Sequence, residues 1–105
     1  MTSRPATEDR PSGDGERGLR SSVLLGILAR GGAISEARLI EVEERRWTIR
    51  LRFVGEKDEY LVNKYESDVP KLYADVGLAI DNIREELGYR GAITLSTDMA
   101  PRPKV

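Results

Sequence analysis

Apolar and polar side chains alternate along residues 46–53, RWTIRLRF, and this alternation constrains the fold more than any other part of the chain. Successive side chains of a β-strand point to opposite faces of the sheet, so strict alternation predicts a strand with one buried face. The buried set would be Trp47, Ile49, Leu51 and Phe53, and the outward set Arg46, Thr48, Arg50 and Arg52. We therefore predict a strand over 47–54 whose outer face carries a row of arginines.

Two flanking segments also have the composition of strands. Residues 33–43, AISEARLIEVE, are rich in β-branched residues, and residues 59–65, EYLVNKY, follow a clear GEKD turn. Short polar connections between the three segments predict an antiparallel meander. Residues 92–96, AITLS, predict a last strand.

The first segment with helical periodicity follows the N-terminal tail. Its apolar positions are Val23, Leu24, Ile27 and Leu28. Ser21 and Ser22 predict an N-cap, and Gly31 and Gly32 predict the stop. Because only one face of this segment is apolar, the first interpretation is that this face packs in the core of the domain. The second interpretation is that the segment docks on a partner.

A second helix is predicted from Asp75, its N-cap, through Leu87, with Gly88 ending it. Its apolar stripe consists of Val76, Ile80, Ile83 and Leu87. A start at Asp68, with Pro70 in the first turn, is the competing boundary. If the helix starts at Asp75, the preceding PKLY is a brief extended segment.

The order helix, three strands, helix, strand predicts an α+β two-layer sandwich, in which one sheet face is covered by helix. Residues 1–20 are rich in Pro, Gly, Ser and charged side chains, a composition that predicts a disordered N-terminal tail. We expect a single domain over 21–98 and a loose C-terminal tail over 99–105.

The chain of 105 residues has neither cysteine nor histidine. This composition excludes disulfides, zinc–thiolate sites and thiol nucleophiles, and it removes the commonest general base. Paired carboxylates act as acid and base only where their environments differ, whereas acidic pairs such as Glu85/Glu86 lie in charged, solvated surroundings. We therefore expect no catalytic residue, no metal site and no cofactor, and a protein that is not an enzyme. No stretch of about 18 apolar residues occurs, so we also expect a soluble, cytoplasmic protein without membrane contact.

The arginine row has two interpretations, and the first is a lattice of ion pairs. A hairpin closed near Arg45 would bring Glu41 and Glu43 beside Arg50 and Arg52, where opposite-charge pairs stabilise a sheet. Residues 34–65 hold seven basic and seven acidic side chains, so this region lacks the basic excess typical of DNA-binding proteins.

The second interpretation is a nucleic-acid surface. Arg46, Arg50 and Arg52 would then bind phosphate, and Tyr60 or Tyr65 would supply the aromatic ring on which bases stack. The alternative for each tyrosine is a half-buried position. The spacing of the arginines favours this surface, whereas the neighbouring glutamates oppose it.

The second predicted helix is acidic. Residues 66–88 hold six acidic and two basic side chains, a net charge of −4, and Asp81 and Glu85 lie on the outward helix surface. Such a surface is a solvated face or a docking site for a basic partner. Gly77, early in this helix, permits a close approach to the sheet or to a second protomer.

The chain resembles small partition-associated accessory proteins of plasmids and integrative elements, of the ParC type, which is unrelated to the topoisomerase subunit. The resemblance is carried by the stretches GAISEARLIEVEERRWTIRLRFVGEKDEYLV, PKLY and AIDNIREELGY. The shared pattern is an Ala-Arg-Leu strand, a Glu-x-x-Trp entry to an Arg-rich strand, a glutamate-tyrosine strand and a helix ending in Leu-Gly. It covers about residues 31–95. The resemblance implies a non-enzymatic part in mobile-element maintenance beside partition proteins, and it transfers no active site.

We therefore expect a non-enzymatic, protein-binding accessory factor, with a partition-type partner or a second copy of itself. The candidate contact residues are Arg46, Arg50, Arg52, Tyr60, Asp81 and Glu85. The alternatives are a nucleic-acid-binding module and an inhibitor or antitoxin-like protein whose tail folds on its target. Homodimerisation is expected because a small open sheet leaves edges that need covering.

Overall fold

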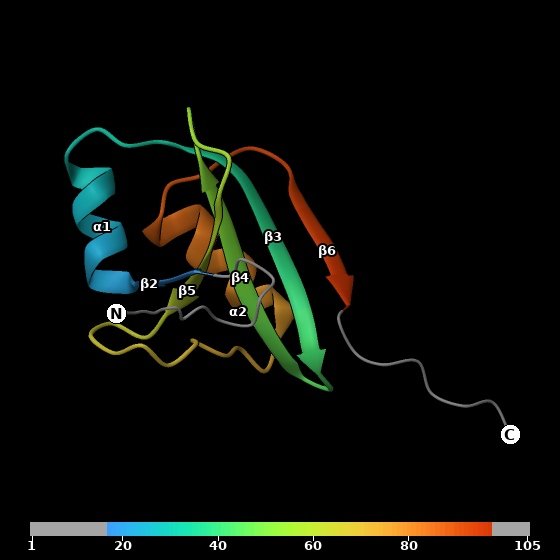
Figure 1. The fold of residues 1–105 in the computed structure, drawn as a ribbon. Helices are drawn as coiled ribbons and strands as arrows, with labels where there is room; N and C mark the ends of the chain where they lie inside the picture. Colours follow the sequence, from blue (N-terminus) through green and yellow to red (C-terminus); the bar gives the residue numbers. More distant parts are fainter. Residues whose placement is uncertain (1–16, 98–105) are drawn as a thin grey trace, which may run out of the picture.

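Residues 17–97 are described by the computed structural model, which has a sheet layer and a helix layer (Figure 1). In chain order they are β2 (Arg17–Arg20), α1 (Ser21–Ala29), β3 (Ile34–Glu43), β4 (Arg46–Phe53), β5 (Glu59–Asn63), α2 (Val76–Asp81), the π-helical turn η1 (Asn82–Glu86) and β6 (Ile93–Thr97).

The strands form one mixed sheet of order β2-β5-β4-β3-β6. The consecutive strands β3, β4 and β5 pair antiparallel, which confirms the predicted meander. β2 adds in parallel to β5 at one edge, and β6 adds in parallel to β3 at the other. Helices α1 and α2 share one core with the sheet, so the predicted α+β two-layer sandwich is confirmed.

The core lies between the sheet and the helices. The alternation of β4 places Ile49, Leu51 and Phe53 there, all buried, with Trp47 partly buried beside them. The helices contribute Leu24, Ala79 and Ile83, and β3 and β5 contribute Ala37, Leu39 and Val62. Burying one large apolar side chain stabilises a fold by roughly 1.5–3 kcal/mol, so this shared cluster holds the layers together.

The domain begins earlier than predicted, because residues 17–20 form β2 rather than the end of a tail. Leu19 lies opposite Val62 and packs against the core, and Arg20 pairs with Asp68 at 3.1 Å. Pairing with β5, more than 40 positions away along the chain, gives this short segment an order that its own composition does not indicate. The remainder of the predicted N-terminal tail, and the predicted C-terminal tail, lie outside the described residues.

The predicted serine cap of α1 is wrong. Arg20 occupies the N-cap position without a capping side-chain hydrogen bond, and Ser21 is already helical. The Ser21 hydroxyl donates instead to the Asn63 carbonyl at 2.6 Å, which ties the start of α1 to the end of β5. The predicted stop is confirmed: the helix ends at Ala29, and Gly31 takes a positive φ of 99°.

The second helix starts as predicted, since the Asp75 carboxylate accepts a hydrogen bond from the Gly77 amide at 2.7 Å. The competing start at Asp68 is wrong, because Pro70 forms an isolated β-bridge with Asn63. The extended PKLY segment is confirmed by that bridge and by a second one between Tyr73 and Trp47. Gly88 ends the helical region with a φ of 72°. The π-helical turn was not predicted.

Candidate functional site

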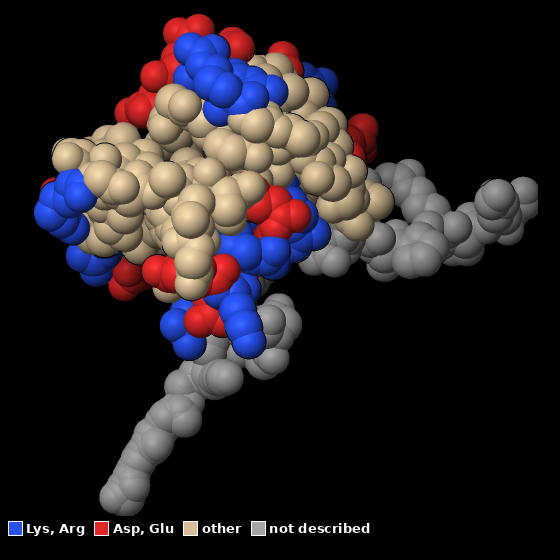
Figure 2. Space-filling view, turned by 90° about the horizontal axis from the view of Figure 1, so that it is seen from above, with Lys and Arg blue, Asp and Glu red and all other residues tan. Residues whose placement is uncertain are grey.

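The outer sheet face carries the predicted arginines, and carboxylates lie among them. Arg52 pairs with Glu36 directly across from it, and Arg46 pairs with Glu43 at 3.3 Å. Figure 2, which views the molecule from above and not onto the outer face, shows basic and acidic atoms adjoining one another. The outer face is therefore an ionic lattice rather than a bare basic strip.

The predicted partners of two arginines are wrong. Glu41 lies opposite Trp47, whereas Arg50 lies opposite Arg38 and Arg52 opposite Glu36. The hairpin turns at Glu44 and Arg45 with a register shift between Glu41 and Glu43, so the residues facing Arg50 and Arg52 come from the first half of β3. Leu39, opposite Ile49, belongs to the core face of β3, and Ile40, opposite Thr48, lies on the other face.

The strongest ion pair on the face joins two strands that are not neighbours. The Arg38 guanidinium on β3 reaches across β4 and donates to both oxygens of Glu59 on β5, at 2.6 and 2.7 Å. These hydrogen bonds lower the pKa of Glu59, and the positive charges of Arg50 and Arg52 add to the effect, while burial opposes it. Glu59 thus stays ionised and stabilises three arginines in one patch.

Tyr60 does not belong to the arginine face. It lies opposite Leu51, and its ring packs against Phe53 with a centroid distance of 5.8 Å on the core side. Its hydroxyl donates to Glu56 at 3.2 Å, and burial is the main cause of the raised pKa of this phenol. The expected stacking platform beside the arginines is therefore missing at this position.

The acidic candidates lie in the other layer. Asp81 ends α2 and Glu85 lies in η1, and both are exposed. Since α2 packs on the sheet face opposite the arginines, the structure does not bring the predicted contact residues into one site.

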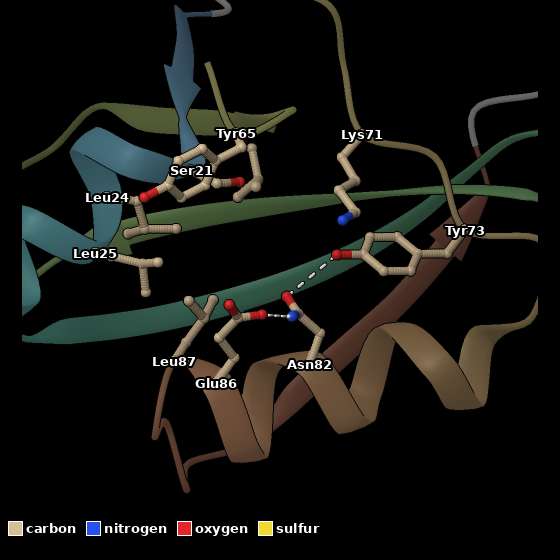
Figure 3. A pocket seen from close by; sticks show the side chains of 10 residues that line it. Ser21, Leu24, Leu25, Tyr65, Lys71, Tyr73, Asn82, Glu86 and Leu87 are labelled. Carbon is tan, nitrogen blue, oxygen red and sulfur yellow. Dashed lines mark hydrogen bonds between the residues drawn. The ribbon is translucent and has the colours of Figure 1, made fainter. Parts of the chain in front are cut away.

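A pocket that sequence reasoning missed lies between α1 and η1 (Figure 3). Its volume is about 70 Å³, and Leu24 and Val62 form a buried floor. The complete lining is Ser21, Leu24, Leu25, Val62, Tyr65, Lys71, Tyr73, Asn82, Glu86 and Leu87. These residues come from four separate segments of the chain, so no local motif marks the pocket.

One wall of the pocket is a chain of hydrogen bonds. The Tyr73 hydroxyl donates to Asn82 Oδ1 at 3.1 Å, and Asn82 Nδ2 donates to Glu86 Oε1 (Figure 3). Burial, reinforced by the Glu86 charge, raises the pKa of Tyr73 to about 12. The phenol is therefore a neutral donor at neutral pH, and the chain fixes the orientation of the Asn82 amide.

The π-helical turn shapes this wall. The Leu87 amide donates to the Asn82 carbonyl at 3.1 Å, five residues back, and Asn82, Glu86 and Leu87 all line the pocket. Single π-turns are rare and occur frequently at functional sites. The turn thus gives a second, independent reason to consider the pocket a binding site.

The β6 edge is a further candidate surface. β6 pairs with β3 on one side, and no strand within residues 17–97 pairs with its other side. Its sequence, ITLST, contains no charge and no proline, and Leu95 is 48% exposed. The opposite edge strand, β2, instead carries Arg17 and Arg20, each in an ion pair.

No protein-family model, no curated protein and no solved structure matches this chain. Within the described part of the chain, no cluster of three or more acidic side chains is arranged to hold a metal ion. Across the same residues, neither helix is long and apolar enough to cross a membrane.

Proposed function

We propose that the chain is a non-enzymatic, protein-binding accessory factor whose binding surface is the β6 edge of the sheet, which no strand of residues 17–97 covers. The observation that supports this proposal is the neutral, β-branched composition of β6 together with its half-exposed Leu95. Natural proteins protect edge strands with charged residues, prolines or bulges, because unpaired backbone groups attract other strands. β6 has neither charge nor proline, whereas β2 has two charged residues.

The partner to which we commit is a second copy of the chain. Two β6 strands related by a two-fold axis pair antiparallel, and the same surface then serves both protomers. Leu95 lies opposite Leu39, on the helix side of the sheet, so the two Leu95 side chains would cover each other beside the joined strands. Pairing of this kind turns two open sheets into one continuous sheet.

The cellular role in this proposal comes from the resemblance in strand pattern. It assigns the dimer to plasmid or mobile-element maintenance, beside partition proteins. A chain without cysteine suits the reducing cytoplasm, where we place its action.

Sedimentation velocity over a range of protein concentrations tests the proposal. We expect a monomer–dimer equilibrium that Leu95→Lys weakens by about tenfold or more, roughly 1.4 kcal/mol. The matched control is Val69→Lys, which places the same charge on a similarly exposed apolar residue, 52% exposed, in the segment after β5.

Hydrogen exchange provides the second readout. The β6 amides are expected to become more protected as the protein concentration rises, while amides of β2 do not change. A protein that stays monomeric at every concentration, or that loses association equally in both lysine variants, contradicts the proposal.

A further inference from the structure

The pocket of Figure 3 has charged groups that strand addition at β6 does not use. The Lys71 ammonium lies 5.6 Å from the centre of the Tyr73 ring, and no carboxylate among residues 17–97 forms an ion pair with it. Glu86 accepts from Asn82 and likewise forms no ion pair within that range. One cation and one anion therefore line the same pocket without neutralising each other.

Burial divides the pocket into an apolar floor and a charged mouth. Leu24 and Val62, at the floor, are almost completely buried, and Leu25 and Leu87 are half-buried on the side toward α1. Lys71 and Glu86 line the pocket and are exposed, so they mark its side toward solvent. A ligand that fits this arrangement has an apolar group at one end and two opposite charges at the other.

The volume limits the apolar group. A dry protein cavity of about 150 Å³ accommodates benzene, so a pocket of about 70 Å³ fits a branched group of three or four carbons.

We propose that this pocket binds a free α-amino acid with a short branched aliphatic side chain. The side chain occupies the leucine-lined floor, the α-carboxylate accepts from the Lys71 ammonium, and the α-ammonium donates to the Glu86 carboxylate. The hydrogen bonds from Tyr73 through Asn82 hold Glu86 in place for this contact. The site lies between α1 and η1, away from the β6 edge, so its occupation goes beyond the proposed protein binding.

The test is a calorimetric titration of the full chain with L-valine and with two analogues that each lack one charge. Isovalerate has no ammonium group, and isobutylamine has no carboxylate. We expect valine to bind about tenfold or more tightly than either analogue, because each analogue lacks one of the two charged contacts.

Two variants separate the two charged contacts. Lys71→Met is expected to weaken valine binding by about tenfold and to leave isobutylamine binding unchanged, because the amine does not use the lysine. Glu86→Gln is expected to weaken valine binding similarly and to leave isovalerate binding unchanged. The matched controls, Lys57→Met and Glu85→Gln, change exposed side chains that do not line the pocket and should bind valine like the unaltered protein.

Three results overturn the proposal: no heat of binding with valine, isovalerate binding as tightly as valine, or unchanged valine affinity in both pocket variants. Thermal unfolding of each variant verifies that it is folded before titration. Sedimentation of the same samples keeps the two proposals separate, since loss of valine binding leaves the β6 dimer intact and Leu95→Lys leaves valine binding intact.

Discussion

At the scale of single residues, Glu59 organises the outer sheet face. Its side chain is 19% exposed, accepts two hydrogen bonds from Arg38, and lies in the field of Arg50 and Arg52. A carboxylate in this position contributes more to the stability of the fold than one in an exposed ion pair. Removing it leaves partly buried guanidinium groups without their counter-charge.

We expect Glu59→Gln to lower the free energy of unfolding by about 1–2 kcal/mol at neutral pH. The folded-state pKa of Glu59 lies below its ordinary value of 4.5, so its ionised form stabilises the fold above that value. This contribution is lost as the pH falls from 4.5 through the lowered folded-state pKa. The difference between the two proteins should therefore shrink with acidification, as measured by urea unfolding across this range.

The control is Asp58→Asn, which removes an exposed ion pair with Arg17 at 3.4 Å. Its effect should stay within about 0.5 kcal/mol at every pH, because exposed pairs contribute little. A Glu59→Gln protein as stable as its parent at neutral pH would show that the Arg38–Glu59 contact adds nothing to the fold.

At this scale the sequence predicts contacts between near neighbours correctly and the register of paired strands incorrectly. Asp75 was identified as a cap because its partner, Gly77, is two residues away. The carboxylates beside Arg50 and Arg52 were assigned wrongly, because a register shift near the turn changes which residues face each other along the entire hairpin. Tyr60 had two placements, beside the arginines or half-buried, because a strand's orientation depends on its pairing; the pairing with β4 gives the half-buried one.

At the scale of elements, the β3–β4 turn contains the clearest strain in the described chain. Arg45 has a φ of 62°, and it is the only non-glycine residue among 17–97 with a positive φ. A left-handed residue beside a bulge is usually glycine, because a side chain there crowds the backbone. Glu41 accepts a hydrogen bond from the Arg45 amide at 3.2 Å and so helps to hold this conformation.

Arg45→Gly is therefore expected to raise the free energy of unfolding by about 0.5–1 kcal/mol, since it relieves this conformation. The comparison is Arg46→Gly, one position later and within β4, where glycine should destabilise by about the same amount. Thermal and denaturant unfolding of the two variants supply the measurement. Equal destabilisation by both would mean that Arg45 is not strained.

The elements that were predicted are those with strong local patterns. The alternation of β4 and the stripe of Ile80 and Ile83 identify their own buried faces. β2 and the π-helical turn were missed because neither has a local signal: β2 is ordered by pairing with β5, and the π-turn differs from an α-turn by one additional residue. The pocket depends on that turn and on segments distant in sequence, so it was missed as well.

At the scale of the whole molecule, the distribution of charge bears on the choice between the proposed protein-binding surface and a nucleic-acid-binding surface. The chain has a net charge of −1, and the outer sheet face pairs its arginines with Glu36, Glu43 and Glu59. Non-specific affinity for DNA comes from basic groups that release counter-ions from phosphates, and arginines held by carboxylates contribute little to it. Tyr60 and Phe53 face the core, so neither of them offers a ring for base stacking beside the arginines.

We therefore expect no change in the anisotropy of labelled single- or double-stranded DNA when the full chain is added at physiological salt. Glu36→Gln should produce weak binding that disappears as salt is raised, because it frees Arg52 while leaving the fold intact. Glu44→Gln, in the exposed turn, removes the same charge away from Arg52 and should not have this effect. The contrary result is DNA binding by the unaltered protein that the double variant Arg50→Glu, Arg52→Glu abolishes. It would mean that the outer face binds phosphate and that its ion pairs break when DNA binds.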